Sequence, residues 1–213
     1  MEELAFADGE IEVVVLPEVG ARLHRIRAFG HDLLRTPDDL DDHVRHPFFW
    51  GAFVMAPWCN RIGAGTMVVG GRAINLRPNF PDGSAIHGQV YARAWEGDGH
   101  GGLRVRAGGD GWPWEYLVGL RVEVSGAEIR IAQTLTNESD EPMPAGLGIH
   151  PWFRRPLAVA IHADAVFPDN ADTHPRPEPV AGPYDLRRMG AMPASLDATW
   201  TQLAEPPVTM AWP

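Results

Sequence analysis

Two histidines lie in sequence contexts where an imidazole could meet a ligand. His150 stands within residues 146–153 (GLGIHPWF), where the glycines before it leave room for close approach by another segment. Pro151 directs His150 away from helical geometry and towards extended backbone. His87 stands in residues 85–88 (AIHG) and is followed by a glycine. Because imidazole titrates near neutral pH, both residues are candidates for acid–base chemistry.

Other roles are open for the same two residues. Buried, hydrogen-bonded histidines often serve structure alone, and imidazole is also the commonest metal ligand. However, His87 and His150 are far apart in the sequence, and neither has a His or Cys at the short spacing of metal ligands. We therefore expect no metal site.

Asn60 and Arg61 follow an apolar, aromatic stretch and introduce polar groups abruptly. They are either a surface pair or donors aimed at an oxygen-rich ligand, which suits the planar guanidinium of arginine. The neighbouring Cys59 is expected to be a small packing residue and not a nucleophile. The chain also has 8 tryptophans, which are most often core residues, although their flat apolar faces also favour a carbohydrate ligand over a charged metabolite.

Composition excludes several classes of function. All 18 basic residues are arginine, so Schiff-base chemistry, lysine-anchored pyridoxal phosphate and the lysine-bearing phosphate loop are excluded. A net charge of −10 argues against nucleic acid or an anionic membrane as a partner. The single cysteine, the acidic start and the lack of a long apolar stretch predict a cytoplasmic protein.

The segments that must position these residues have sequence patterns typical of β-strands. Alternating apolar residues in 11–15 predict a strand that ends at a proline and a glycine. Residues 67–76 predict a hairpin that turns at Gly70-Gly71. Residues 120–131 predict a second hairpin, which turns at Ser125-Gly126 and has one solvated face.

The fold class is therefore all-β, a sandwich or something larger, in a single domain over residues 1–213. Residues 168–183 are rich in proline and predict a loop, and residues 208–212 alternate like the start of a strand. A chain that ended there would leave an unpaired apolar edge, so we expect further strands downstream.

Several motifs in order resemble the aldose 1-epimerase (galactose mutarotase) family. They are VVLPEVGARL (14–23), MAPWCNRI (55–62), AIHG (85–88) with Trp95, MPAGLGIHPWF (143–153) and Leu196-Asp197. Cys59 and Trp152 replace the Pro or Ala and the Tyr that are commoner in the family, and neither change removes a charge.

The resemblance implies a large β-sandwich of the galactose mutarotase type, expected here to be incomplete at the C-terminus. It also implies an isomerase that interconverts the α and β anomers of an aldohexose without a cofactor. By resemblance His150 protonates the ring oxygen and His87 assists there. Arg61 and Asp197 hold sugar hydroxyls, and Asn60 belongs to the same motif as Arg61.

The family's catalytic base is a Glu on a late strand. The late Glu205 lacks that context, so no residue of this chain is assigned the role. Two alternatives follow. One is a carbohydrate-binding domain without catalysis, and the other is a hexose-6-phosphate 1-epimerase, in which Arg104–Arg106 or Arg154–Arg155 would meet the phosphate. The identity of the sugar and the oligomeric state stay open.

Overall fold

The computed structural model of the protein describes residues 1–168 and 176–213. It divides into two compact units, residues 1–153 and 154–213, which we describe separately. The prediction of a single domain over 1–213 stays a prediction. Of the loop predicted over 168–183, residues 169–175 lie outside the described residues, and the described part contains a two-residue strand, Glu178–Pro179.

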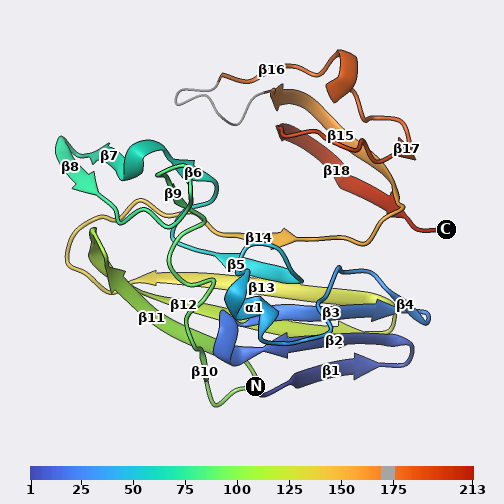
Figure 1. Ribbon diagram of the computed structural model, residues 1–213, viewed down its shortest axis with the longest axis horizontal. Coiled ribbons are helices and arrows are strands. Elements are labelled where there is room, and N and C mark those ends of the chain that lie inside the picture. Colours follow the sequence, from blue (N-terminus) through green and yellow to red (C-terminus); the bar gives the residue numbers. More distant parts are fainter. Residues whose placement is uncertain (169–175) are drawn as a thin grey trace. The chain divides into compact units, whose positions relative to one another are not determined.

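The first unit is built on a six-stranded antiparallel sheet (Figure 1). Its order is β1-β2-β3-β5-β14, with β4 paired to β3. The strands are β1 (Leu4–Asp8), β2 (Ile11–Leu16), β3 (Arg22–Ala28), β4 (His31–Asp32), β5 (Ala52–Met55) and β14 (Gly148–Pro151). The short strand β14 pairs only with β5, so it lies at the edge of the sheet.

A second antiparallel sheet has the order β10-β11-β12-β13. Its strands are β10 (Glu96–Gly97), β11 (Leu103–Gly109), β12 (Trp112–Ser125) and β13 (Glu128–Asn137). Along β12 buried and more exposed residues alternate, which is the pattern of a strand with one face on a core and one in solvent. The hairpin predicted for 120–131 is confirmed, with Ser125 paired to Glu128 across the turn.

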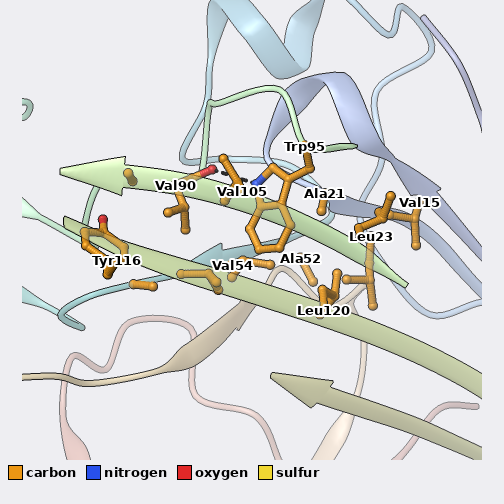
Figure 2. Packing of buried hydrophobic residues seen from close by; sticks show 14 of the residues in the cluster. Val15, Ala21, Leu23, Ala52, Val54, Val90, Trp95, Val105, Tyr116 and Leu120 are labelled. Atoms are coloured by element: carbon orange, nitrogen blue, oxygen red, sulfur yellow. Dashed lines mark hydrogen bonds between the residues drawn. The ribbon is translucent and has the colours of Figure 1, made fainter. Parts of the chain in front are cut away.

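The two sheets pack face to face, and apolar side chains from both fill the space between them. Val15, Leu23 and Val54 of the first sheet belong to one buried cluster with Val105 and Leu120 of the second. Figure 2 shows Trp95 and Tyr116 among these side chains. The all-β class and the sandwich predicted from the sequence are therefore confirmed.

Smaller elements complete the first unit. The pairs β6 (Arg61–Ile62) with β9 (Ala85–Ile86) and β7 (Thr66–Val69) with β8 (Arg72–Asn75) are two-stranded. The second pair is the hairpin predicted at Gly70-Gly71, and both glycines have positive φ, as a tight two-residue turn requires. The helical turns are η1 (Pro17–Val19), η2 (Gly63–Gly65) and α1 (Asp42–Arg45).

The first sheet also has an outer face, and this face positions the candidate site. Successive side chains of a strand point to opposite faces, so residues next to the core residues Leu23 and Val54 lie on the outer face. These outer residues are Arg22 and His24 on β3 and Phe53 on β5. His150 pairs with Phe53 across β14 and β5 and so joins the same face.

The second unit is a smaller sheet around β15 (Ala158–Phe167). That strand pairs with β16 (Glu178–Pro179), β17 (Gly190–Ala191) and β18 (Thr199–Ala211), and η3 (Gly182–Tyr184) is a short helical turn. The alternation predicted for 208–212 lies in β18, which runs to Ala211. Among the described residues, no helix has the length and apolar character needed to cross a membrane.

Candidate active site

His87 is held in an uncommon backbone conformation directly after β9. Its φ is +59°, in the left-handed region that residues other than glycine rarely adopt. The backbone N–H of His87 donates to the carbonyl of Asn60 (3.1 Å), while the N–H of Asn60 donates to Nδ1 of His87 (3.2 Å). Gly88 packs against Ala56 so closely that a Cβ there would lie 1.9 Å from the Ala56 oxygen. These contacts over-determine the loop and lock the ring in place.

The hydrogen bond to Nδ1 also assigns the tautomer of His87. A ring nitrogen that accepts an N–H carries no proton in the neutral imidazole, so the proton sits on Nε2. The neutral ring of His87 is therefore an N–H donor at Nε2.

His150 is held by strand pairing and by ring stacking. Its Cα partner across the sheet is Phe53, and the two rings stack with centroids 4.7 Å apart and planes inclined by 9°. Such cross-strand pairs are the basic stabilising unit of a sheet. The close approach expected at the glycines is found at Gly148, where a Cβ would lie 2.8 Å from Sγ of Cys59. At Gly146 the nearest atom would be 3.8 Å away.

The structure brings the two candidate imidazoles together. The ring centroids of His87 and His150 are 5.1 Å apart with planes inclined by 71°. Phe53 lies against both rings, 5.5 Å from His87. Phe48 contacts His87 and Trp152 contacts His150. Aromatic side chains surround the pair. Both imidazoles are partly exposed, so the pair is accessible to solvent.

Both histidines are held in the neutral form near pH 7. Burial, with added repulsion from His150 and Arg61, lowers the pKa of His87 to about 4. Burial also lowers the pKa of His150; its own backbone acts in the opposite direction, and the charge of Arg22 adds to the lowering. The permanent charges that add to the lowering are those of Arg61 at His87 and Arg22 at His150. The site therefore has positive surroundings.

Arg61 and Asn60 lie beside this pair. Arg61 is paired with Ile86, the residue before His87, across β6 and β9. Its Nε donates to Asp82 (3.0 Å), and its guanidinium lies 5.3 Å from the ring centroid of Phe80. The side-chain oxygen of Asn60 accepts the N–H of Arg61 (2.9 Å). Arg61 is thus an oriented, exposed cation close to His87.

Asp197 belongs to the second unit, where it is exposed between β17 and β18. Its assignment to a sugar hydroxyl stays a prediction, as do the roles of the other four candidate residues. Within residues 1–168 and 176–213, no group of three or more His, Cys, Asp or Glu is placed to hold a metal ion.

Sequence reasoning missed the residues that support the pair. Arg22, Phe53, Tyr91 and Asp82 were not among the candidates, although each contacts a candidate residue or its aromatic neighbours. A signal was the position of Arg22 next to the core residue Leu23 in a strand, which places Arg22 on the outer face of the sheet.

Comparison with known proteins identifies the family of this chain. The family model described as aldose 1-epimerase matches residues 3–188. The uncharacterized protein YphB of Escherichia coli (strain K12) is 26% identical over 120 residues, which cover 53% of this chain and 40% of that protein.

Solved structures support the fold. The GalM/aldose epimerase homologue from C. elegans superposes with a TM-score of 0.74 at 19% identity, over 89% of this chain and 65% of that one. Galactose 1-epimerase from Lactobacillus acidophilus NCFM gives a TM-score of 0.69 at 20% identity, over 88% and 61%. A galactose mutarotase-like protein from Clostridium acetobutylicum gives 0.72 at 22% identity, over 84% and 61%. The chain thus spans less than two thirds of the length of these three proteins.

Proposed function

Because this chain belongs to the aldose 1-epimerase family, we propose that it interconverts the α and β anomers of a free aldohexose by acid–base ring opening. The observation that carries the proposal is the contact between His87 and His150. These two imidazoles come from distant parts of the sequence, are partly exposed and are surrounded by aromatic side chains. Aromatic faces suit the apolar faces of a pyranose ring.

The reaction needs two proton movements. The anomeric hydroxyl loses its proton while the bond from C1 to the ring oxygen breaks, and the ring oxygen gains a proton. Rotation about the bond between C1 and C2, followed by the reverse steps, yields the other anomer. A positioned group at each proton contributes on the order of a hundred- to ten-thousand-fold.

We assign His150 as the proton donor to the ring oxygen, acting in the minority protonated form that its lowered pKa leaves near pH 7, and His87 as a hydrogen-bond donor beside it. His87 suits that part because its Nδ1 accepts the Asn60 N–H, so its Nε2 carries the proton. Arg61 would hold a sugar hydroxyl, since Asp82 and Phe80 already orient its guanidinium. Asn60 and Asp197 are proposed as further hydroxyl partners.

A free sugar suits the site better than a sugar phosphate. Arg104 and Arg106 lie on β11 in the other sheet and are paired with Glu96 and Glu138. In the second unit, Arg155 donates to the carbonyls of Met192 and Pro193. These guanidinium groups are engaged within the protein, which disfavours the hexose-6-phosphate alternative.

Polarimetry tests the proposal directly. Freshly dissolved α-glucose or α-galactose is followed with purified protein, and we expect equilibration faster than in buffer. His150→Ala should lower the rate by about a hundred- to ten-thousand-fold. His31→Ala, a change at an exposed histidine on β4, is the control and should leave the rate unchanged. Sugar 6-phosphates are measured beside the free sugars.

A second function, sugar binding without catalysis, is favoured by one observation. Among the described residues, neither His87 nor His150 forms an ion pair with a carboxylate, and the permanent charges that act on them are those of Arg61 and Arg22, so no base for the anomeric proton is identified beside them. This alternative predicts calorimetric heat on mixing with a sugar and equilibration at the buffer rate. That pair of results would replace the first proposal by the second.

A further inference from the structure

Arg22 is a fully buried cation beneath the histidine pair. Its exposed fraction is 0%, and among the described residues it forms no ion pair with a carboxylate. Burying an unpaired charge is costly unless hydrogen bonds compensate. Burial accordingly lowers the pKa of Arg22 to about 10, yet the side chain stays charged at neutral pH.

Three backbone carbonyls compensate part of this cost. Nη1 of Arg22 donates to the carbonyl of Trp50 (2.9 Å), and Nη2 donates to those of Pro47 (2.6 Å) and Tyr91 (3.3 Å). Because a guanidinium holds its donors in a fixed fork, it binds these carbonyls together with defined geometry. Arg22 therefore ties β3 to the segment 47–50 and to the loop after His87.

The tied segments carry the aromatic rings around His87. Phe48 lies between Pro47 and Trp50 and contacts the rings of His87 and Tyr91, with centroids 6.1 and 4.6 Å apart. The carbonyl of Phe48 also accepts the indole N–H of Trp152 (2.7 Å). Loss of the hydrogen bonds from Arg22 would therefore leave the aromatic rings that border both imidazoles less firmly held.

Arg22 is also linked to His150 through a stacked column of side chains in which Phe53 lies between them. Its guanidinium carbon is 5.3 Å from the ring centroid of Phe53, within the range of a cation–π contact. The ring of Phe53 stacks on His150 at 4.7 Å. The order of the column is therefore guanidinium, phenyl ring and imidazole.

We propose that Arg22 is a positioning residue for the histidine pair, which fixes the rings around His87 through three carbonyls and acts on His150 through Phe53. It touches neither imidazole in the contacts described, so it acts through other residues. This inference rests on the proposed function where it concerns catalysis, and on geometry and charge where it concerns the imidazoles.

The charge of Arg22 adds an electrostatic effect to the mechanical one. The titratable or charged groups that act on His150 or contact it are His87 from the loop after β9 and Arg22 from β3. Tyr91 contacts Phe53, the ring stacked on His150, and Arg61 acts on His87. A permanent positive charge disfavours a second one on His150. Removing it should therefore make His150 easier to protonate, whereas a purely structural cross-link would not predict such a change.

The test compares two substitutions at Arg22 with one at Arg27, an exposed arginine on the same strand. Arg22→Met removes the charge and the fork, Arg22→Lys keeps a charge and loses the fork, and Arg27→Met is the matched control. The imidazole signals of His150 and His87 are titrated by NMR, and kcat and KM for a free aldohexose are measured against pH.

In Arg22→Met we expect the His150 titration to move to higher pH and kcat to fall by about 10- to 100-fold, as for a small displacement of a reacting group. In Arg22→Lys we expect a similar loss of kcat with the His150 titration close to that of the parent protein. Arg27→Met should change neither. A folded Arg22→Met variant with unchanged His150 titration and unchanged kcat overturns the proposal.

Phe53→Leu keeps the test decisive if the Arg22 variants do not fold. It leaves the three carbonyl bonds in place and removes the ring between Arg22 and His150. We expect a fall in kcat and broadened His150 signals, and unchanged values for both would overturn the proposal. If the parent protein shows no epimerase activity while the His150 titration still moves in Arg22→Met, the proposed function fails and the positioning role stands.

Discussion

At the scale of single residues, several imidazoles at the outer face of the first sheet are held neutral. Besides the partly exposed His87 and His150, they include the buried His24, whose Nδ1 is 2.9 Å from Nε2 of His43. His43 lies on the short helix α1 with 1% of its surface exposed, and its Nδ1 has no partner among the described residues. Protonating such a pair would bury charge without compensation.

The first prediction concerns acid stability. Burial, with repulsion from Arg22 and His24, lowers the pKa of His43 to about 3, against 6.5 when unfolded. Between these values the unfolded chain binds the extra proton, so the stability from neutral His43 is complete above pH 6.5 and is lost as pH falls towards 3. The slope is up to about 1.4 kcal/mol per pH unit for this proton.

Urea unfolding at pH 7 and pH 5 measures this effect. His43→Gln keeps a hydrogen-bonding group that does not titrate in this range, so it should reduce the loss of stability between the two pH values. His31→Gln, at an exposed position, should leave that loss as it is in the parent protein. An equal loss in the parent and in His43→Gln would contradict the assignment.

The second prediction concerns Asp82, which orients Arg61. Asp82 accepts the Nε–H of Arg61 (3.0 Å) and also the N–H and hydroxyl of Ser84. Asp82→Asn removes the charge from the ion pair and keeps the shape. We expect KM for a free aldohexose to rise several-fold with little change in kcat, because Arg61 is proposed to bind the substrate and not to transfer a proton. A fall in kcat at constant KM would argue against this role.

At the scale of elements, the loop after β9 joins backbone strain to close packing. His87 and Gly88 both have positive φ, and Ala56 forms a bridge to Gly88. Residues with such conformations persist only where the surroundings enforce them, and they cluster at functional sites. This loop sets the position of His87, so its packing and its chemistry are coupled.

The third prediction compares two glycines that have similar backbones. Gly83→Ala places a Cβ in open space at φ +82°, so it should cost about 1–2 kcal/mol from the left-handed conformation alone. Gly88→Ala has φ +76° and also drives the Cβ to 1.9 Å from the Ala56 oxygen, so it should cost more and displace His87. Chemical denaturation and the His87 NMR signal measure both effects. Equal costs for the two variants would show that the close contact is relieved without strain.

At the scale of the whole molecule, the hydrophobic cluster lies within the first unit. Every residue of this cluster, including the partly buried ones packed against it, falls within residues 1–153. The main pairing of the second unit, β15 with β18, is internal to residues 154–213. Since a domain needs its own core to fold alone, the first unit has what independent folding requires.

The fourth prediction is that residues 1–153 fold without the second unit. We expect a cooperative unfolding transition and near-ultraviolet circular dichroism from buried aromatic residues such as Trp112 and Tyr116. A fragment with strand content but no cooperative transition would contradict it. The sugar affinity of the fragment is then compared with that of the full-length Asp197→Ala variant. This comparison tests whether Asp197 accounts for any sugar affinity that the fragment loses.

The sequence by itself determined the elements whose signals are local. Alternation along 11–15 and 120–131 identified strands, and Gly70-Gly71 and Ser125-Gly126 identified turns, because the side-chain period and the turn chemistry of a strand depend on neighbouring residues. The motifs around His87 and His150 likewise marked the candidate residues before their positions were known.

Only the tertiary structure decided what surrounds those two histidines. His87 meets His150 because the segments that carry them both pair with residues 53–56. Phe53 on β5 pairs with His150, and Ala56, the residue after β5, forms a bridge to Gly88. No local pattern encodes these pairings. Arg22 was equally hidden, since an arginine in a strand reads as solvated until the segment 47–50 covers it. Burial and electrostatic repulsion arise from contacts between distant segments, so the neutral state of the imidazoles is a property of the fold.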